Sequence, residues 1–292
     1  MKKLGVFTSI FFVVALILSI TIAPATVNAT ITNLNPSGDV ALYKIEPMTT
    51  NYNYGIWLQC SVGFEMQFGN PRTDRLLIQF DLSSIPPGAT VNEAHLHLYL
   101  WGHTGPHSTQ RTYSANRVTK AWVEGDGPST TPFGGSYGAT WNDADKAIPD
   151  PWTSPGGDFT TVDAATVVTR TGTTIHDVIG WYDLNVTTIV KAWIENGQPN
   201  YGFLIKDLNE WSGTEYEAIF LSREAGPRYK PILEIDYDLP SQQRPLIDPS
   251  SSVVGGYCFS INKLEVLSPY LMAIGLIGSV FVASFIIRGK RH

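Results

Sequence analysis

Two imidazole and two aromatic side chains alternate with leucines along one stretch of the sequence: His95, His97, Tyr99 and Trp101. Alternate residues of a β-strand share one face, so these four point one way and the leucines point into a core. Sugar rings have flat C–H faces, and their sites combine an exposed aromatic ring with a few polar groups. The stretch therefore predicts a sugar-binding strip. The alternative is that a neighbouring loop within 125–180 covers these rings.

The other tryptophans differ in their surroundings. Trp211 lies in the polar turn 209–213, where a core tryptophan is unexpected, so we predict that it is an exposed platform for a ligand. Four more tryptophans are predicted to be packing residues: Trp122, Trp141, Trp181 and Trp193.

The histidines and the acidic residues of the chain also raise the possibilities of metal binding and catalysis. His95 and His97, with His103 and His107 nearby, have a spacing that could hold zinc, but no cysteine or carboxylate partner is fixed beside them. Hydrolysis of a glycoside needs a pair of carboxylates at a set separation. Several acidic residues lie in the long loop region, and no motif selects a pair among them: Glu124, Asp126, Asp143, Asp145 and Asp158. They fit a structural calcium at least as well, and we predict a protein without catalytic activity.

The elements that position these residues are mostly strands. Short runs rich in β-branched and aromatic residues, separated by Gly, Pro, Asn and Asp, predict strands at 40–45, 57–62, 75–81, 91–100, 112–118, 165–170, 201–207, 217–222 and 231–237. One short helix is predicted over 187–195, ended by Gly197. We therefore expect an all-β fold, a two-sheet, jelly-roll-like β-sandwich with one short helix, and a long decorated loop at 125–180.

Both ends of the chain carry apolar segments. Lys2 and Lys3 precede an apolar run that ends at the small residues of a signal-peptidase site, and an uncleaved anchor is the alternative. A second uncharged run, at 270–287, is long enough to span a bilayer and is followed by basic residues, which favour the cytoplasm. The predicted organisation is a signal peptide at 1–29, a folded extracellular domain at 30–239, a stalk at 240–268, a transmembrane helix at 269–288 and a cytoplasmic tail at 289–292.

The charge balance limits the partners. Residues 30–240 contain 13 Lys and Arg against 24 Asp and Glu, which argues against a nucleic-acid partner. The basic residues available for an anionic sugar include Arg75 and Arg223, which could instead form internal ion pairs, so neutral and acidic sugars both stay open. The two cysteines are Cys60, predicted to lie in the core, and Cys258, which receives no role.

The sequence also resembles a known family. The blocks that carry the likeness occur in the family's order: DRLLIQFDLSSIP (74–86), AHLHLY (94–99), VTKAW (118–122), TWN (140–142), WTSPGGD (152–158), NYGFLIK (200–206) and SRE (222–224). Together they are similar to the disaggregatase-related domain, also called the DNRLRE domain, over most of 39–238. The naming motif is degraded here to TDRLL (73–77), and we expect no second domain beside this one.

The resemblance implies a β-sandwich that serves as a carbohydrate-binding module in secreted and surface proteins of bacteria and archaea. Activity that a neighbouring catalytic domain supplies elsewhere is not implied. We predict a surface-anchored module that binds an extracellular polysaccharide or surface glycan through Trp211, Trp101, Tyr99 and His97. The alternatives are a structural envelope protein that binds other surface proteins, and a hydrolase or lyase of matrix polysaccharide.

Overall fold

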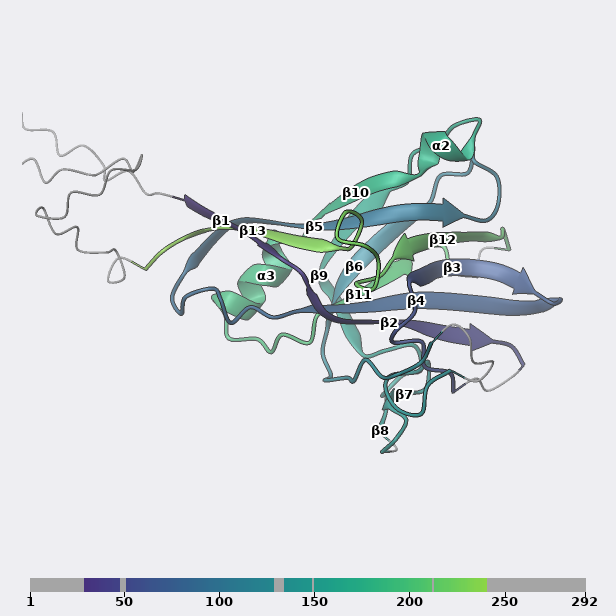
Figure 1. The fold of residues 1–292 in the computed structure, drawn as a ribbon, viewed down its shortest axis with the longest axis horizontal. Coiled ribbons are helices and arrows are strands. Elements are labelled where there is room, and N and C mark those ends of the chain that lie inside the picture. The colour runs from purple at the N-terminus through teal and green to yellow at the C-terminus, as the bar shows by residue number, and fades with distance from the viewer. Residues whose placement is uncertain (1–28, 48–50, 129–133, 149, 212, 241–292) are drawn as a thin grey trace, which may run out of the picture. The chain divides into compact units, whose positions relative to one another are not determined.

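The strands of this protein form one large curled antiparallel sheet, with a small two-stranded sheet beside it (Figure 1). The computed structural model describes residues 29–47, 51–128, 134–148, 150–211 and 213–240. The strands are β1 (Ala29–Leu34), β2 (Pro36–Ile45), β3 (Gln59–Gln67), β4 (Asn70–Phe80), β5 (Thr90–His103), β6 (Thr112–Val118), β7 (Asp143–Asp145), β8 (Asp150–Pro151), β9 (Phe159–Val168), β10 (Gly180–Asn185), β11 (Phe203–Asp207), β12 (Tyr216–Leu221) and β13 (Ile232–Asp238). The helices are α2 (Ile175–Val178) and α3 (Thr187–Ile194).

The order of the strands depends on two long ones. The sheet runs β1-β13-β5-β12-β3-β4-β11-β6-β9, with β10 also paired to β5 and β2 also paired to β4. β5 can bond to three strands because β13 takes residues 90–97, β12 takes 100–103 and β10 takes 95–100. β4 is shared in the same way among β2, β3 and β11. Each of these two strands therefore joins three neighbouring strands of the curled sheet.

The all-β class predicted from the sequence is confirmed. Every predicted strand overlaps an observed strand, and the predicted helix at 187–195 is α3. The prediction of a single helix was wrong, because the described residues also contain α2. The long loop at 125–180 was predicted too broadly, since it contains β9 and the small β7-β8 sheet. The prediction also missed β1 and β10: β1 is a mixed polar segment that is held by pairing to β13 along its whole length.

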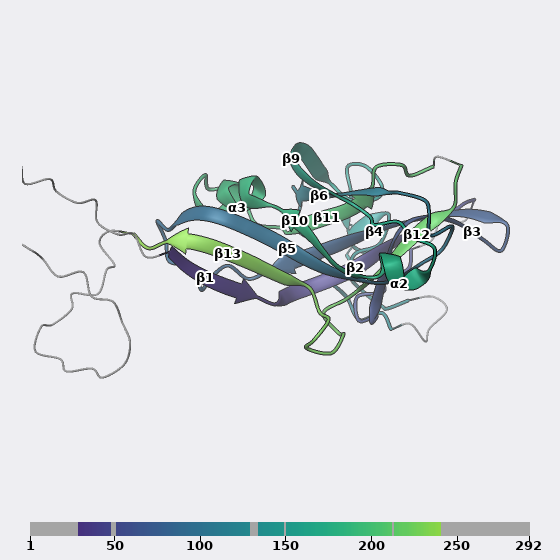
Figure 2. The same ribbon diagram turned by 90° about the horizontal axis from the view of Figure 1, so that it is seen from above.

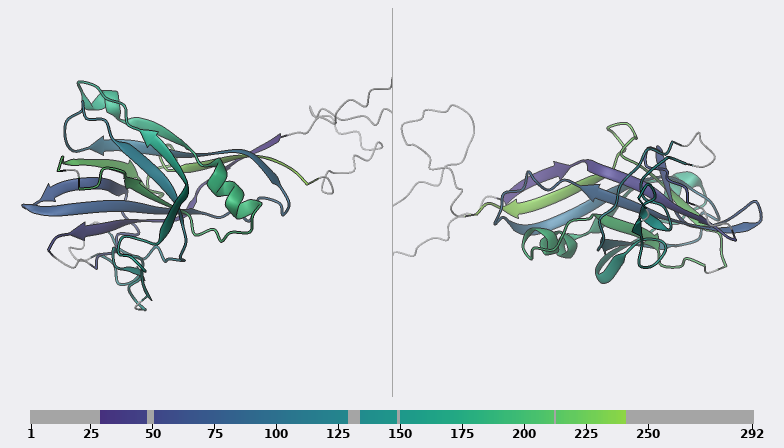
Figure 3. Two further views of the ribbon diagram at one scale, coloured as in Figure 1. Left: turned by 180° about the vertical axis from the view of Figure 1, so that it is seen from behind. Right: turned by 90° about the horizontal axis from the view of Figure 1, so that it is seen from below.

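The main core lies against β5, β4, β11, β12 and β13 and includes Cys60, as predicted. Leu96, Leu98 and Leu100 of β5 are buried in it, which confirms the predicted core face of that strand. The helix α3 contributes Trp193, whose ring meets the ring of Phe203 at 4.8 Å. This helix packs against β5, at the end of the sheet where β1 and β13 lie (Figures 2 and 3).

A second hydrophobic layer covers the outer face of β2, β4, β6 and β11. It is built on one side from strand residues such as Leu42 and Leu204, and on the other from residues of the segment 119–158, including Trp141 and Trp152. The strands β7 and β8 belong to this segment and lie beside β2 in Figure 1. A loop within 125–180 was the alternative cover for the aromatic rings of β5. The part of that loop up to residue 158 packs instead on the outer face of β2, β4, β6 and β11.

One buried asparagine fixes this covering segment. The Asn53 amide nitrogen donates to the carbonyls of Glu124 (2.6 Å) and Ala139 (2.8 Å), and its oxygen accepts the backbone N–H of Gly127 (3.0 Å). A Cβ added at Gly125, where φ is +93°, would lie 2.3 Å from that oxygen. The glycine-rich sequence of the segment is thus explained by close backbone approach around one side chain.

Several predictions concern residues outside the described ranges. They are the signal peptide up to residue 28, the stalk from 241, the transmembrane helix, the tail and Cys258. Ala29, the last residue of the predicted signal peptide, is the first residue of β1 and pairs with Asp238. Within the described ranges, no helix is long and apolar enough to span a membrane.

We expect Asn53→Ala to lower the free energy of unfolding by about 2–4 kcal/mol, because several buried backbone groups lose their partner at once. Urea denaturation of the wild type and variant measures this difference. Asn92→Ala is the matched control: Asn92 is exposed and makes one 3.2 Å hydrogen bond to Asp236, so its loss should be below about 0.5 kcal/mol. Equal losses in the two variants would contradict the anchoring role of Asn53.

Candidate functional site

The outer face of β5 carries the predicted strip, and its alternation is confirmed. His95, His97 and Tyr99 are partly exposed, while the leucines between them are buried. Trp101 is 51% exposed and lies at a β-bulge: in the pairing with β12, Leu100 faces Phe220 and Gly102 faces Ile219, which leaves Trp101 without an opposite residue. A bulge changes the direction of the extra side chain, and here that side chain is the indole.

The outward rings of β5 have aromatic neighbours that the sequence did not assign to the site. Trp181 of β10 lies opposite Tyr99 in register, and the two rings meet edge to face at 5.3 Å. Tyr229 meets Tyr99 at 4.6 Å. Trp181 is 39% exposed, so its prediction as a packing residue was wrong. We call Tyr99, Trp101, Trp181 and Tyr229 the aromatic strip.

The other three tryptophans predicted to pack do so. Trp141 and Trp193 are buried, and Trp122 is partly buried against the second layer, with its indole N–H donating to the carbonyl of Tyr201 at 2.8 Å. Trp181 differs because β10 pairs with β5 on one side only, and its outward residues are left uncovered. The signal that could have identified it is the alternation Trp181-Tyr182-Asp183, where the middle residue alone is buried.

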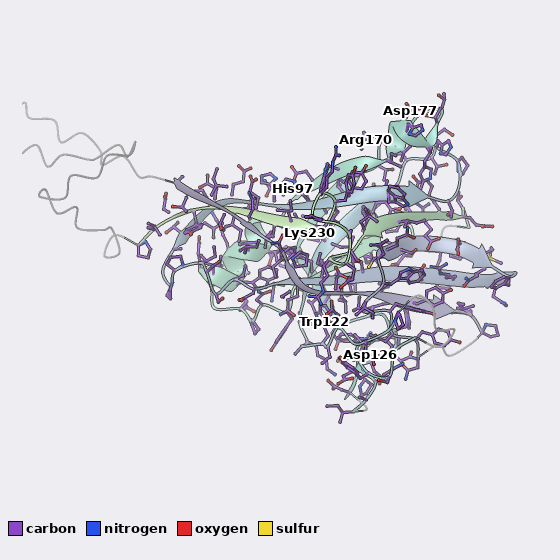
Figure 4. All side chains as sticks on the ribbon, in the orientation of Figure 1. His97, Trp122, Asp126, Arg170, Asp177 and Lys230 are labelled. Carbon is purple, nitrogen blue, oxygen red and sulfur yellow. The ribbon has the colours of Figure 1, made fainter. Side chains whose placement is uncertain are left out.

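Imidazole and carboxylate groups continue the face beyond the aromatic strip. His95 lies between Asp183, 2.9 Å from its Nδ1, and Glu93, 2.9 Å from its Nε2. His97 Nδ1 lies 3.7 Å from the same Asp183 carboxylate (His97 is labelled in Figure 4). Partial burial opposes the charge on His95, but the hydrogen bonds to Glu93 and Asp183 prevail and raise its pKa. The face therefore offers both hydrogen-bond donors and acceptors beside the rings.

The four histidines form two separate pairs. His95 and His97 stack on β5, whereas His103, the last residue of β5, has its Nε2 3.0 Å from Nδ1 of His107 in the following loop. Burial lowers the pKa of His103. Among the residues that the structure describes, no group of three or more His, Cys, Asp and Glu side chains is arranged to hold a metal ion.

Trp211 occupies a different place from the aromatic strip. It is 44% exposed, as predicted, and its neighbours are Phe64 of β3 at 5.6 Å and the Lys44 ammonium of β2 at 5.0 Å from the ring. Its φ of +69° lies in the left-handed region, which is uncommon for an aromatic residue and costs about 1 kcal/mol. The structure thus divides the predicted site residues between two surfaces.

The loop carboxylates are engaged in local turns and ion pairs. Asp126 accepts the backbone N–H of Ser136, Asp145 accepts that of Gly138, and Asp158 accepts those of Thr153 and Ser154. Glu124 accepts the backbone N–H of Asp39 and pairs with Arg223. Asp143 lies in β7. The structural calcium stays a prediction, and these contacts explain four of the five acidic residues without it.

Arg75 and Arg223, the two arginines that could bind an anionic ligand or form internal ion pairs, form internal pairs. Arg75 holds Glu210 in a two-point contact, with both N–O distances 2.9 Å, and also donates to the carbonyl of Gly156. Arg223 pairs with Glu124 and Glu224. Their guanidinium groups are therefore part of the fold.

Sequence reasoning missed a buried ionic cluster. Arg72 binds Glu65 (2.5 Å), Asp74 (2.6 Å) and Glu217 (2.8 Å), and its guanidinium lies over the ring of Tyr43. One cation among three carboxylates leaves excess negative charge in a buried place. Burial raises the pKa of Asp74 to about 6 despite Arg72, and burial with neighbouring carboxylates raises the pKa of Glu65 and Glu217.

No family model matches the chain, and no curated protein matches it. The likeness to the disaggregatase-related domain therefore stays a prediction that depends on the ordered sequence blocks.

The ionic cluster predicts a dependence of stability on pH. A carboxyl group whose pKa is higher in the folded state binds protons more tightly there, so stability rises as pH falls towards the pKa of the unfolded chain and is lost as pH rises through the folded value. We expect the free energy of unfolding of the wild type to increase as the pH is lowered from 8 to 5. Glu217→Gln should reduce this gain by on the order of 1 kcal/mol.

Thermal melting across that pH range tests the expectation. The control is Glu215→Gln, because Glu215 is exposed. Parallel pH profiles for the wild type and Glu217→Gln would show that Glu217 does not take up a proton on folding.

Proposed function

We propose that the folded region is a non-catalytic carbohydrate-binding module for an extracellular or envelope polysaccharide. The observation that carries this proposal is the aromatic strip: Trp181 meets Tyr99 edge to face, Trp101 follows Tyr99 two residues along β5, and the two indoles are exposed, at 39% and 51%. A group of exposed aromatic side chains promotes aggregation, so on a protein surface it commonly marks a binding site. Sugar C–H faces are suitable partners for them.

The chemistry of the surrounding groups supports the same ligand class. His97 and Asp183 border the aromatic strip, because Asp183 lies opposite His97 two residues along the register from the Trp181 and Tyr99 pair. They can exchange hydrogen bonds with sugar hydroxyls while the rings contact the apolar face. Lys230, which Figure 4 labels, comes two residues before Ile232, the residue of β13 that lies opposite His97. A site of this kind binds by contact and needs no turnover.

We further propose that the curled sheet is a jelly-roll-like sandwich of the disaggregatase-related type. What supports this is that one hydrophobic core receives side chains from β5 and β13 as well as from β4, β11 and β6. In this proposal the domain is exported and anchored through the C-terminal apolar segment, which would place the aromatic strip at the cell surface. Its role there is attachment or organisation of the polysaccharide matrix.

Binding of the purified ectodomain, residues 30–240, to a glycan array tests the proposal. We expect a signal for at least one polysaccharide, and a loss of tenfold or more in affinity, about 1.4 kcal/mol, in Trp101→Ala. Phe68→Ala is the matched control, because Phe68 is also an exposed aromatic residue, at 94%, but lies at the tip of the β3–β4 hairpin. A folded protein that binds no glycan would favour the structural envelope role.

Trp211 is the second platform in this proposal, supported by its exposure and its strained backbone. Because its neighbours differ from those of Trp101, we expect the losses from Trp211→Ala and Trp101→Ala to add in the double variant within about 0.5 kcal/mol. The affinity of the two single variants and the double variant for the same array ligand gives this comparison. Unchanged binding in Trp211→Ala would remove Trp211 from the site.

Release of reducing ends from the bound polysaccharide tests for hydrolysis. We expect none, because Glu124 and most of the other loop carboxylates are held by the contacts described above. Steady release by the wild type would overturn the non-catalytic assignment and favour a hydrolase.

A further inference from the structure

The end of β10 carries the acceptor pattern for N-linked glycosylation. Asn185-Val186-Thr187 has the form Asn-x-Thr with a residue other than proline in the middle. Asn185 is the last residue of β10 and is exposed, while Val186 is buried and starts the turn into α3. The chain therefore presents the asparagine to solvent and fixes its position through the next residue.

The hydrogen bonds leave the amide nitrogen of Asn185 as its more accessible end. Its Oδ1 accepts the backbone N–H of Thr187 (3.2 Å) and the Thr187 hydroxyl (2.7 Å). Its Nδ2 has a long 3.3 Å contact to Glu93 Oε1, and the Glu93 side chain is itself 57% exposed. The carbonyl side is thus held against the protein, and the nitrogen lies among exposed groups.

We propose that Asn185 is the attachment site of an N-linked oligosaccharide. The donor class is a lipid-linked oligosaccharide phosphate, and the transferase belongs to the cell. A bond forms between Asn185 Nδ2 and the anomeric carbon, the bond from that carbon to the phosphate oxygen breaks, and the lipid phosphate leaves with the electron pair. The proton lost from Nδ2 passes to a base of the transferase. The reaction requires the export that the N-terminal segment predicts.

The position of Asn185 relates the glycan to the proposed sugar site. Asn185 lies opposite His95 in register, on the same outward side of β10 as Asp183 and Trp181. A glycan there would stand over the imidazole and carboxylate end of the face. An external polysaccharide would then approach from the Trp101 end. This consequence depends on the proposed function, whereas the modification itself does not.

The experiment is peptide mass mapping of the full chain purified from membranes of the organism that encodes it. Trypsin releases Asn185 in the peptide from Thr171 to Lys191, which contains this Asn-x-Thr pattern once. We expect the peptide to carry an added oligosaccharide mass. Asn185→Asp should lose the added mass and keep the fold, because the aspartate accepts the same two hydrogen bonds. Thr187→Ser should keep both the pattern and the added mass.

An unmodified Thr171–Lys191 peptide from the wild-type chain overturns the proposal, and Asn185 is then a turn residue alone. An added mass that persists in Asn185→Asp also overturns it, because another residue must carry the sugar. Melting temperatures of the three proteins establish that they are folded. Glycan-array binding of the Asn185→Asp ectodomain tests the carbohydrate-binding function separately, since loss of the attached glycan leaves the aromatic strip intact.

Discussion

The backbone pairing of β5 is the constraint on which the rest of the structure depends. This strand has 14 residues and bonds to β13, β12 and β10. Its register fixes which residues of three neighbours share a face, because opposite residues point the same way. The leucines of β5 then enter the core, and Tyr99 and His97 face outward. The bulge at Trp101 follows from the same pairing, since β12 skips that position.

Two outer parts of the curled sheet differ in whether another segment covers them. The segment 119–158 covers the face of β2, β4, β6 and β11 with a second hydrophobic layer held by Asn53. The face of β5 and β10 keeps Trp101 and Trp181 exposed. A covered face contributes burial and stability, and an uncovered aromatic face is free for a ligand. This asymmetry is the strongest link between the fold and the proposed function.

Several carboxylates of this acidic chain are paired with arginines inside the fold. Arg72 and Arg223 each contact more than one carboxylate, and Arg111 pairs with the fully buried Asp207 at 2.5 Å. Removing one partner from such a pair leaves a buried charge that costs several kcal/mol. These three arginines are therefore held by carboxylates of the fold, and the groups available for polar recognition beside the aromatic strip are the histidines and carboxylates of β5 and β10.

The sequence by itself determined nine of the strands, the helix at 187–195 and the inward and outward sides of β5, because these depend on local period and turn residues. It also predicted that Trp211 is exposed, and it left Trp101 open between an exposed and a covered position. Only the tertiary structure decided that Trp181 joins Tyr99, that Trp211 stands apart, and that Arg72 gathers three carboxylates. Those contacts depend on which distant strands pair and in what register, and long-range pairing leaves no local signature in the chain.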